Sequence, residues 1–303
     1  MKKYFTLLST ILIISSCDIV EGPYLTDENI NPIIDTTANS YVKKVLVEDF
    51  TGHLCPNCPD AAEELETIQE IYNDPDIYGA QIIGMAIHVS KTFARPYPAS
   101  QAPSFQYDFR TQWGDNWDDF YGISEVGLPR GMVNRIGYPN NHKLSKDEWA
   151  NEVANELNKE ADFGIDINTT INSITISSNV LNNVNGNYNL VVCLTESNVI
   201  NWQKKGQENV ENYIHNHVLK SVLIDENLSN STSYIAGDQI ETLINYDLAA
   251  LEQYNIDYST NNTAELGNGN AGDWNASNMS VIGYIYNTNT KEIVQVEETQ
   301  LNN

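Results

Sequence analysis

The stretch VLVEDFTGHLCPNCPDAAEELETI, Val45 to Ile68, decides the fold prediction. Its first residues are a short apolar run of the kind that forms a buried strand, and the run breaks at Gly52. After the break, Ala61, Leu65 and Ile68 recur at helical spacing. Cys55 and Cys58 stand between the two patterns, so the sequence places a CxxC pair between a predicted strand and a predicted helix.

The cysteine pair admits three interpretations: metal binding, a structural bridge, or thiol chemistry. A structural zinc site needs about four ligands, and a CxxC supplies two. The sequence holds no second CxxC. His215 and His217 would share one strand face, but they follow far along the chain in another predicted domain. We therefore predict no metal and no cofactor at this site.

Thiol chemistry uses the neighbouring residues as well. If Cys55 is the N-cap of the helix, Pro56 and Pro59 fall at N1 and N4, where a missing backbone N–H has no intrahelical partner to lose. The Cys55 sulfur would then lie at the positive end of the helix dipole, which favours thiolate. Cys58, one turn later, could attack a mixed disulfide formed on Cys55.

The surrounding segments predict an α/β domain over residues 41–160. AQIIGMAIHV is a second candidate for a buried strand, and GMVNRIG is a third. SKDEWANEVANEL begins with a capping box, Ser145 and Glu148, ahead of a helical apolar pattern. Residues 91–125 are rich in aromatics, Pro and Ser, and we expect them to form a long irregular insertion.

Beyond Ala161 the apolar period changes from helical to two. Phe163, Ile165 and Ile167 alternate with polar residues, and further short strands follow between Asn, Gly and Ser clusters. This pattern is typical of a β-sandwich, so residues 161–303 are predicted to fold as a separate all-β domain.

The N-terminus predicts export. Lys2 and Lys3 precede an apolar run too short to span a bilayer, and the run ends in ISSC at Cys17. Residues 1–16 resemble a lipoprotein signal peptide, with Cys17 as the lipidated residue and 17–40 as a flexible tether. Without residues 1–16 the chain has 14 basic and 41 acidic residues, a net charge of −27. Such a charge argues against nucleic acid and against charge-driven adhesion to anionic membranes.

The order of strand, CxxC, helix, strand and a proline loop resembles the thioredoxin superfamily. The resemblance implies that Cys55 is the nucleophile, Cys58 the resolving thiol, and Asp49 a buried acid that takes the proton of Cys58. It also implies that GLPRG binds substrate, with Pro129 as a cis-proline and Leu128 as a backbone contact for a peptide; Arg130, next to them, is a further candidate. The chain departs from the superfamily at His53-Leu54, where a tryptophan is usual, and in its long insertion.

Four motifs together resemble a family of outer-membrane lipoproteins named after a twenty-eight-kilodalton member. They are EDFTGHLCPNCP, GLPRGMVNR, YIHNHVLKSVL and VIGYIYNTNTKEIVQVEE. The resemblance implies a lipid-anchored outer-membrane protein, on its periplasmic or cell-surface face, with a thioredoxin-like domain and a β-sandwich.

Two functions follow from these observations. The first is thiol–disulfide exchange on envelope proteins or peptides that carry thiols or disulfides. The second is a non-catalytic surface or assembly lipoprotein in which the Cys55–Cys58 bridge staples a helix start. The four arginines lie between residues 95 and 135, where ion pairs that pin the insertion are favoured over a role at the thiolate. Cys193, in an apolar run, is predicted to be a buried, inert thiol.

Overall fold

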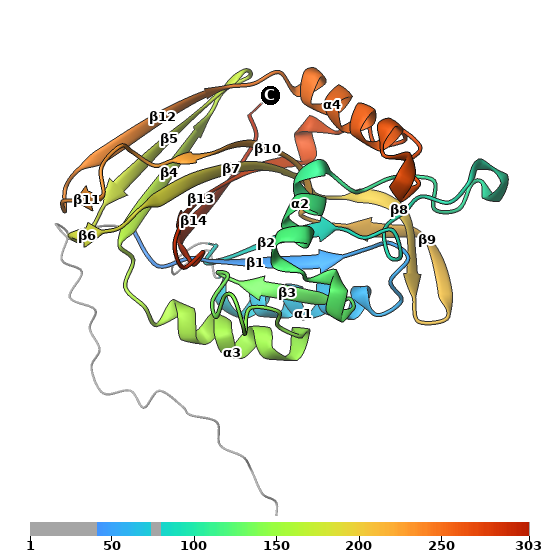
Figure 1. Cartoon of the computed structure of the whole chain (residues 1–303), viewed down its shortest axis with the longest axis horizontal. Coiled ribbons are helices and arrows are strands. Elements are labelled where there is room, and N and C mark those ends of the chain that lie inside the picture. Colours follow the sequence, from blue (N-terminus) through green and yellow to red (C-terminus); the bar gives the residue numbers. More distant parts are fainter. Residues whose placement is uncertain (1–40, 74–79, 303) are drawn as a thin grey trace, which may run out of the picture. The chain divides into compact units, whose positions relative to one another are not determined.

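Two parallel strands, β1 (Val45–Thr51) and β2 (Ile82–His88), begin the fold and are connected through α1 (Cys58–Tyr72). β3 (Arg130–Val133) pairs antiparallel with the other edge of β1, and α3 (Lys146–Leu157) follows it. The structure is a computed structural model that describes residues 41–73 and 80–302. Figure 1 shows α1 and α3 on the same side of these three strands.

Alternation along β1 separates two cores. Val45 and Val47 face α1 and α3, where they pack with a cluster that includes Leu65 and Trp149. Leu46 and Phe50 face the opposite side and belong to a second cluster. The α3 helix begins with the expected capping box, in which the Ser145 and Glu148 side chains bond reciprocally to the backbone.

The sheet continues beyond β2 into the second half of the chain. Its order is β14-β13-β7-β10-β2-β1-β3, with β10 parallel to β2 and the pairs among β10, β7, β13 and β14 antiparallel. At the junction Val218 lies beside Ala86, and the Ala86 N–H donates to the His217 carbonyl at 2.8 Å. The added strands are β7 (Tyr188–Glu196), β10 (Val218–Asn227), β13 (Met279–Asn287) and β14 (Ile293–Gln300).

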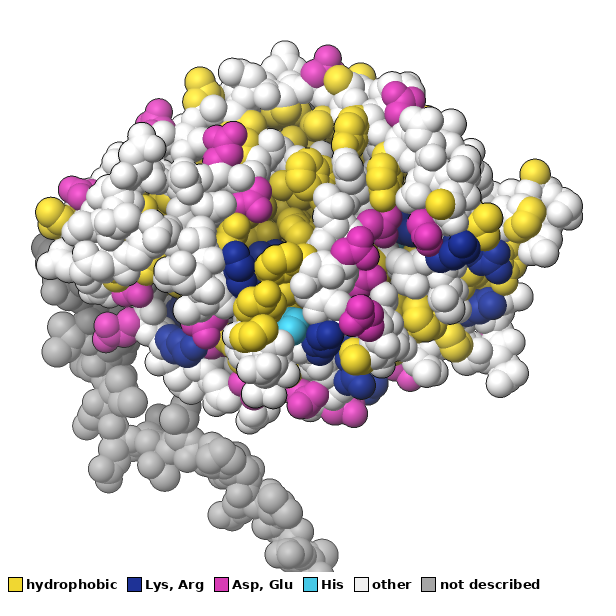
Figure 2. Space-filling model, in the orientation of Figure 1, with side chains coloured by type: hydrophobic (Ala, Val, Ile, Leu, Met, Phe, Trp, Pro, Cys, Tyr) yellow, Lys and Arg dark blue, Asp and Glu magenta, His cyan; other side chains and the backbone are white. Residues whose placement is uncertain are grey.

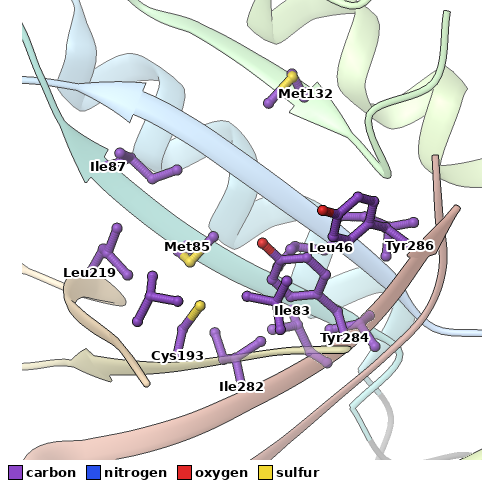
Figure 3. Close-up of a cluster of buried hydrophobic side chains, with 14 of the residues drawn as sticks. Leu46, Ile83, Met85, Ile87, Met132, Cys193, Leu219, Ile282, Tyr284 and Tyr286 are labelled. Atoms are coloured by element: carbon purple, nitrogen blue, oxygen red, sulfur yellow. The ribbon is translucent and has the colours of Figure 1, made fainter. Parts of the chain in front are cut away.

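This continuous sheet corrects the expectation that residues 41–160 and 161–303 fold as separate domains. The described residues, 41–73 and 80–302, belong to one compact unit. Figure 3 shows the reason: Met85 of β2, Cys193 of β7 and Ile282 of β13 point into one buried cluster. Because the two segments share a sheet and a hydrophobic core, neither segment buries its apolar surface by itself.

The all-β expectation for the second segment holds in part. A three-stranded antiparallel sheet, β12-β5-β4, packs over β7 and β13 through an apolar cluster that includes Phe163, Ile176, Val192 and Val281. The two layers form a sandwich, but its second layer is the long mixed sheet. The remaining strands are β4 (Phe163–Thr169), β5 (Ser173–Val180), β6 (Val184–Asn185), β8 (Val199–Lys205), β9 (Glu208–His215), β11 (Ser233–Tyr234) and β12 (Gln239–Asn245).

Two helices were not expected from the sequence. The insertion, expected to be irregular, contains α2 (Gln112–Tyr121), which the Thr111 side chain caps and left-handed Gly122 ends. The second segment contains α4 (Leu248–Asn261), capped by Asp247. Short 3₁₀ helices lie at Ala99–Gln101, Ser124–Val126, Thr263–Glu265 and Ala276–Asn278.

The surface agrees with the acidic composition. The whole sequence has a formal net charge of −25, and Figure 2 shows Asp and Glu side chains spread over the displayed face with Lys and Arg between them. Within the described part of the chain, no helix is long and apolar enough to cross a membrane.

Candidate functional site

The two cysteines form a disulfide at the start of α1. Cys55 closes a turn in which its N–H donates to the Gly52 carbonyl at 2.9 Å, and Cys58 is the first residue of the helix. The N-cap is Asn57, so the expectation that Cys55 occupies that position is wrong. Pro59 therefore stands at N2, where its missing N–H still costs no helical bond. Gly52 is required at the turn, because a Cβ there would lie 2.3 Å from the Phe93 carbonyl oxygen.

Asp49 lies on the β1 face that leads to the cysteines. It pairs with Ala86 of β2 and Gly131 of β3, and it is only 3% exposed. Burial raises the pKa of its carboxyl to about 7, and its Oδ1 atom has no hydrogen-bond partner. The predicted burial of Asp49 is confirmed, while its role as a proton acceptor stays a prediction.

Glu48 occupies the opposite face, as strand alternation requires. It forms a buried ion pair with Arg135, whose Nη2 and Nε atoms donate to its two carboxylate oxygens at 2.6 and 2.9 Å. Arg135 also donates to the Tyr284 hydroxyl at 2.8 Å. The two neighbouring acids therefore differ in their hydrogen bonding: both carboxylate oxygens of Glu48 have a partner, and Asp49 has an oxygen without one.

A cavity of about 50 Å³ joins Asp49 to Cys58. It is enclosed by the end of β1, α1, the end of β2, Gln203 of β8 and the segment from β9 to β10. Its wall includes three histidines: His88, and His215 and His217 from much later in the chain. His88 and His215 are almost fully buried, with unpartnered ring nitrogens, and burial lowers the pKa of both rings.

The histidines correct one expectation. His215 ends β9 and His217 lies in the turn before β10, with φ of 54°, so they do not share a strand face. They also line one cavity with Cys58 and do not lie in a distant domain. Even so, among residues 41–73 and 80–302 no group of three or more His, Cys, Asp or Glu side chains is arranged to hold a metal ion.

The proline loop lies beside the helix start. The Leu128–Pro129 peptide bond is cis, as expected. A surface hollow of about 390 Å³ contains all three predicted substrate-binding residues, Leu128, Pro129 and Arg130. The same hollow includes Asn57, which stands between the two cysteines, and Asp60 of the first helical turn. The structure thus brings the loop and the CxxC helix to one surface.

Two segments cover the disulfide. From the insertion, the Phe93 carbonyl accepts from the Leu54 N–H at 2.8 Å, and His53 Nε2 lies 2.9 Å from the Arg95 carbonyl oxygen. From the other side comes the β8–β9 hairpin, residues 199–215. As a result the Cys55 and Cys58 residues are 1% and 2% exposed.

The hairpin attaches to the CxxC loop at three points. The Lys204 N–H donates to the His53 carbonyl at 2.8 Å, and the Gly206 N–H donates to the Pro56 carbonyl at 2.9 Å. At the preceding residue, the buried Gln203 side chain donates to the Cys55 carbonyl at 3.0 Å. Sequence reasoning missed this hairpin, because no local pattern shows that residues about 150 positions later complete the loop.

Other predicted residues lie elsewhere. Arg110 pairs with Asp108 at 2.8 Å inside the insertion, and Arg135 pairs with Glu48 outside it. Neither of these two ion pairs joins the insertion to the rest of the domain, so the favoured pinning role of the arginines stays a prediction. Cys193 is fully buried in the apolar cluster of Figure 3, and burial raises the pKa of its thiol. Cys17, the signal 1–16 and the tether 17–40 lie outside the described residues.

The model of one protein family, described as outer membrane protein Omp28, matches residues 115–303. The chain belongs to the Omp28 family. This match spans the proline loop, the β8–β9 hairpin and the long sheet's C-terminal strands, and it begins after the CxxC pair. The family resemblance stated from the sequence motifs is therefore confirmed. No curated protein matches the chain.

Solved structures share the fold at low sequence identity. HBP35 of Porphyromonas gingivalis matches with a TM-score of 0.59 and 14% identity over 86% of this chain and 76% of that chain. Protein AGR_C_4864 from Agrobacterium tumefaciens matches with a TM-score of 0.50 and 13% identity over 87% of this chain and 96% of that chain. A domain of the outer membrane lipoprotein Omp28 from Porphyromonas gingivalis is 15% identical over 47% of this chain and 89% of that chain, with a TM-score of 0.24. The first two likenesses concern the mixed α/β fold alone.

Proposed function

We propose that this Omp28-family protein carries out thiol–disulfide exchange on proteins or peptides of the cell envelope. The observation that carries the proposal is the placement of Asp49: a buried acid with an orphaned oxygen shares one small cavity with Cys58 of the CxxC disulfide. A carboxyl with a pKa of about 7 can both accept and release a proton near neutral pH. A disulfide that only stabilised the start of the helix would not need such a carboxyl group beside it.

The proposed reaction, in the direction that reduces a substrate disulfide, has two steps. The Cys55 thiolate attacks one substrate sulfur, forms a mixed disulfide and expels the other substrate sulfur as thiolate. Cys58 then passes its proton to Asp49 and attacks the Cys55 sulfur, which restores the Cys55–Cys58 bond and releases the second substrate thiolate. Each turnover moves two electrons from the cysteine pair to the substrate. The reverse sequence oxidises a substrate dithiol.

The elements β1, α1, β2, β3 and α3 support a thioredoxin-like assignment for this part of the fold. The hollow at Leu128, Pro129 and Arg130 supports binding of an extended substrate segment beside the cysteines. Main-chain groups of such a loop can pair with a peptide backbone, which suits substrates of many sequences. We propose that lipid on Cys17 tethers the protein at the outer membrane.

A second candidate function is a non-catalytic surface or assembly lipoprotein with a structural disulfide. The burial of both cysteines favours it, because an attacking thiolate needs access to a disulfide sulfur. Under thiol exchange the insertion or the β8–β9 hairpin must move away to expose Cys55. Under the structural alternative neither segment needs to move.

Trapping of the mixed disulfide separates the two functions. Cys58→Ser removes the resolving thiol, so envelope substrates should stay linked to Cys55 after thiols are blocked with N-ethylmaleimide during lysis. The adducts should disappear on reduction and should be absent from the matched Cys55→Ser protein. Adduct-free Cys58→Ser protein in cells that produce it in folded form would contradict the exchange function.

A further inference from the structure

The cavity beside Asp49 has a wall of unusual polarity for a protein interior. Asp49, His88 and His215 are 3%, 3% and 5% exposed, yet each has a side-chain atom that lacks a hydrogen-bond partner. His88 lacks a partner at both ring nitrogens. Buried polar groups are nearly always paired, because an unpaired one costs about 1–3 kcal/mol. His217 Nδ1 lacks a partner as well, so four residues with unpartnered polar atoms line one cavity and point to a polar occupant.

The size and the ligand set identify water as that occupant. A cavity needs about 10–15 Å³ to hold one water molecule, and water binds where two to four polar partners converge. This cavity has about 50 Å³. A metal ion fits the wall less well, since within the described residues no three metal-binding side chains are grouped as ligands.

Aromatic packing holds the two imidazoles in place. The His88 ring stacks on Phe109 at a centroid distance of 4.5 Å, and the His215 ring lies 4.6 Å from the same phenyl ring. The Tyr213 ring packs edge-on against His215 at a centroid distance of 4.8 Å. The two histidine rings lie 5.5 Å apart. Because the ring planes are fixed, their free nitrogens stay directed at fixed positions.

The cavity reaches from a buried end to the surface. Its inner wall contains Cys58, Asp49 and His88, which are buried. Its outer wall contains Glu66 of α1 and Ile214 of β9, which are exposed. Water in the cavity would therefore connect Asp49 to solvent between α1 and the β8–β9 hairpin.

We propose that water held by His88 and His215 forms the path along which protons pass between Asp49 and solvent. The proposal rests on the proposed thiol exchange. In that reaction Asp49 gains the proton of Cys58 when Cys58 attacks the mixed disulfide, and it must lose this proton before the next turnover. Asp49 itself is buried, so the proton needs carriers, and the released proton balances the one that the leaving substrate thiolate takes up from solvent.

His88 and His215 act in this path as positioning residues, because they orient water and do not touch the reacting sulfurs. As a neutral imidazole, His88 offers water one donor and one acceptor, while His215 offers its single unpartnered nitrogen, Nε2. The titratable groups that face Asp49 across the cavity come from all the elements packed around it. They are Cys58 and Glu66 of α1, His88 of β2, Tyr213 and His215 of β9, and His217 before β10.

Titration of Asp49 in the oxidised full chain tests the path by a measurement that does not depend on thiol-exchange activity. The probe is the ¹³C signal of the Asp49 carboxyl, assigned through Asp49→Asn. His215→Phe keeps the aromatic contacts but removes the polar atoms, so loss of water should raise the titration midpoint by more than one pH unit, a change above tenfold in proton affinity. His215→Gln should bring the midpoint back close to the wild-type value. His142→Phe, at a buried histidine outside this cavity, is the matched control and should change nothing.

Two further measurements keep the test decisive. His88→Phe provides a second aromatic replacement if His215→Phe does not fold. In the wild-type protein, nuclear Overhauser transfer from water to the His215 ring protons should be detectable. An Asp49 midpoint that is unchanged by a folded Phe variant, or a His215 ring without water contact, would overturn the path.

The path also predicts a kinetic effect, which separates it from the proposed function. His215→Phe should slow resolution of a mixed disulfide on Cys55 at least tenfold, and His215→Gln should restore the rate. If the disulfide does not exchange with thiols at all while the titration behaves as expected, the exchange function fails and the hydrated cavity stands. If exchange proceeds and neither the titration nor the resolution rate responds, the path fails alone.

Discussion

Replacement of Asp49 by asparagine should stabilise the protein, and increasingly so as the pH rises. Burial raises the pKa of Asp49 from 3.8 to about 7 in the folded protein. Below about pH 4 the carboxyl is protonated in both the folded and the unfolded state and makes no difference. Between about pH 4 and 7 the unfolded chain loses this proton while the folded protein retains it. The unfolded state then binds fewer protons, so the free energy of unfolding falls as the pH rises.

The size of the effect follows from the shift. About three pKa units at about 1.36 kcal/mol each amount to about 4 kcal/mol, and this loss is complete above about pH 7. Asparagine does not ionise, so Asp49→Asn should avoid the whole loss. Its free energy of unfolding relative to wild type should rise by about 4 kcal/mol between about pH 4 and pH 9.

Urea unfolding of the oxidised full chain at several pH values measures this difference. All other titrating groups are common to both proteins, so they cancel in the comparison. Asp60→Asn, at an exposed carboxyl in the first turn of α1, is the matched control and should stay within about 0.5 kcal/mol of wild type at every pH. A constant difference between Asp49→Asn and wild type across the pH range would refute the reasoning.

Three further predictions concern other parts of the molecule. Mass spectrometry of the mature N-terminus should show a diacylglyceryl group on Cys17, and an unmodified N-terminus at another residue would contradict lipidation. Arg135→Met should lower the free energy of urea unfolding by about 3–5 kcal/mol, because Glu48 would stay buried without its counter-ion; adding Glu48→Gln should recover part of the loss, and no recovery would argue against the pair. Gln203→Leu should speed reduction of the disulfide by a water-soluble phosphine severalfold, because the hairpin loses its side-chain bond to the Cys55 carbonyl; an unchanged rate would show that the hairpin does not limit access.

Features set by near neighbours in the chain were predictable. Alternation along β1 alone requires that Asp49 and Glu48 face opposite sides, and the thioredoxin resemblance indicated which one faces the cysteines. The Ser145 capping box and the burial of Cys193 likewise follow from local patterns. Each of these depends on only a few consecutive residues.

The domain boundary was wrong because periodicity reports which face of a strand is buried but not which strand lies at its edge. The change of period near Ala161 is real, since strands follow it. The sequence does not show, however, that β10 pairs with β2 through Val218 and Ala86. Local signals for α2 existed in Thr111 and Gly122, which cap its two ends, but the aromatic and proline-rich surroundings concealed them.

The residues that line the site from the second half of the chain could not be predicted, again because long-range strand pairing is not visible in the sequence. Gln203 and His215 come from a hairpin about 150 residues after the cysteines, and they reach the site only because β10 docks on β2. His215 was assigned to a separate domain from Cys58, although both line one cavity. When long-range strand pairing brings a polar residue into a buried site, the residues next to it in the sequence give no sign of this.

Equilibration of the full chain with glutathione buffers tests the central claim most directly. The fraction of reduced Cys55–Cys58 is read from alkylation and mass after the reaction is stopped with acid. Thiol exchange predicts that both forms are populated at potentials between about −270 and −120 mV, the range of thioredoxin-type pairs. A disulfide that stays fully oxidised until below about −300 mV, as structural disulfides do, would contradict the account.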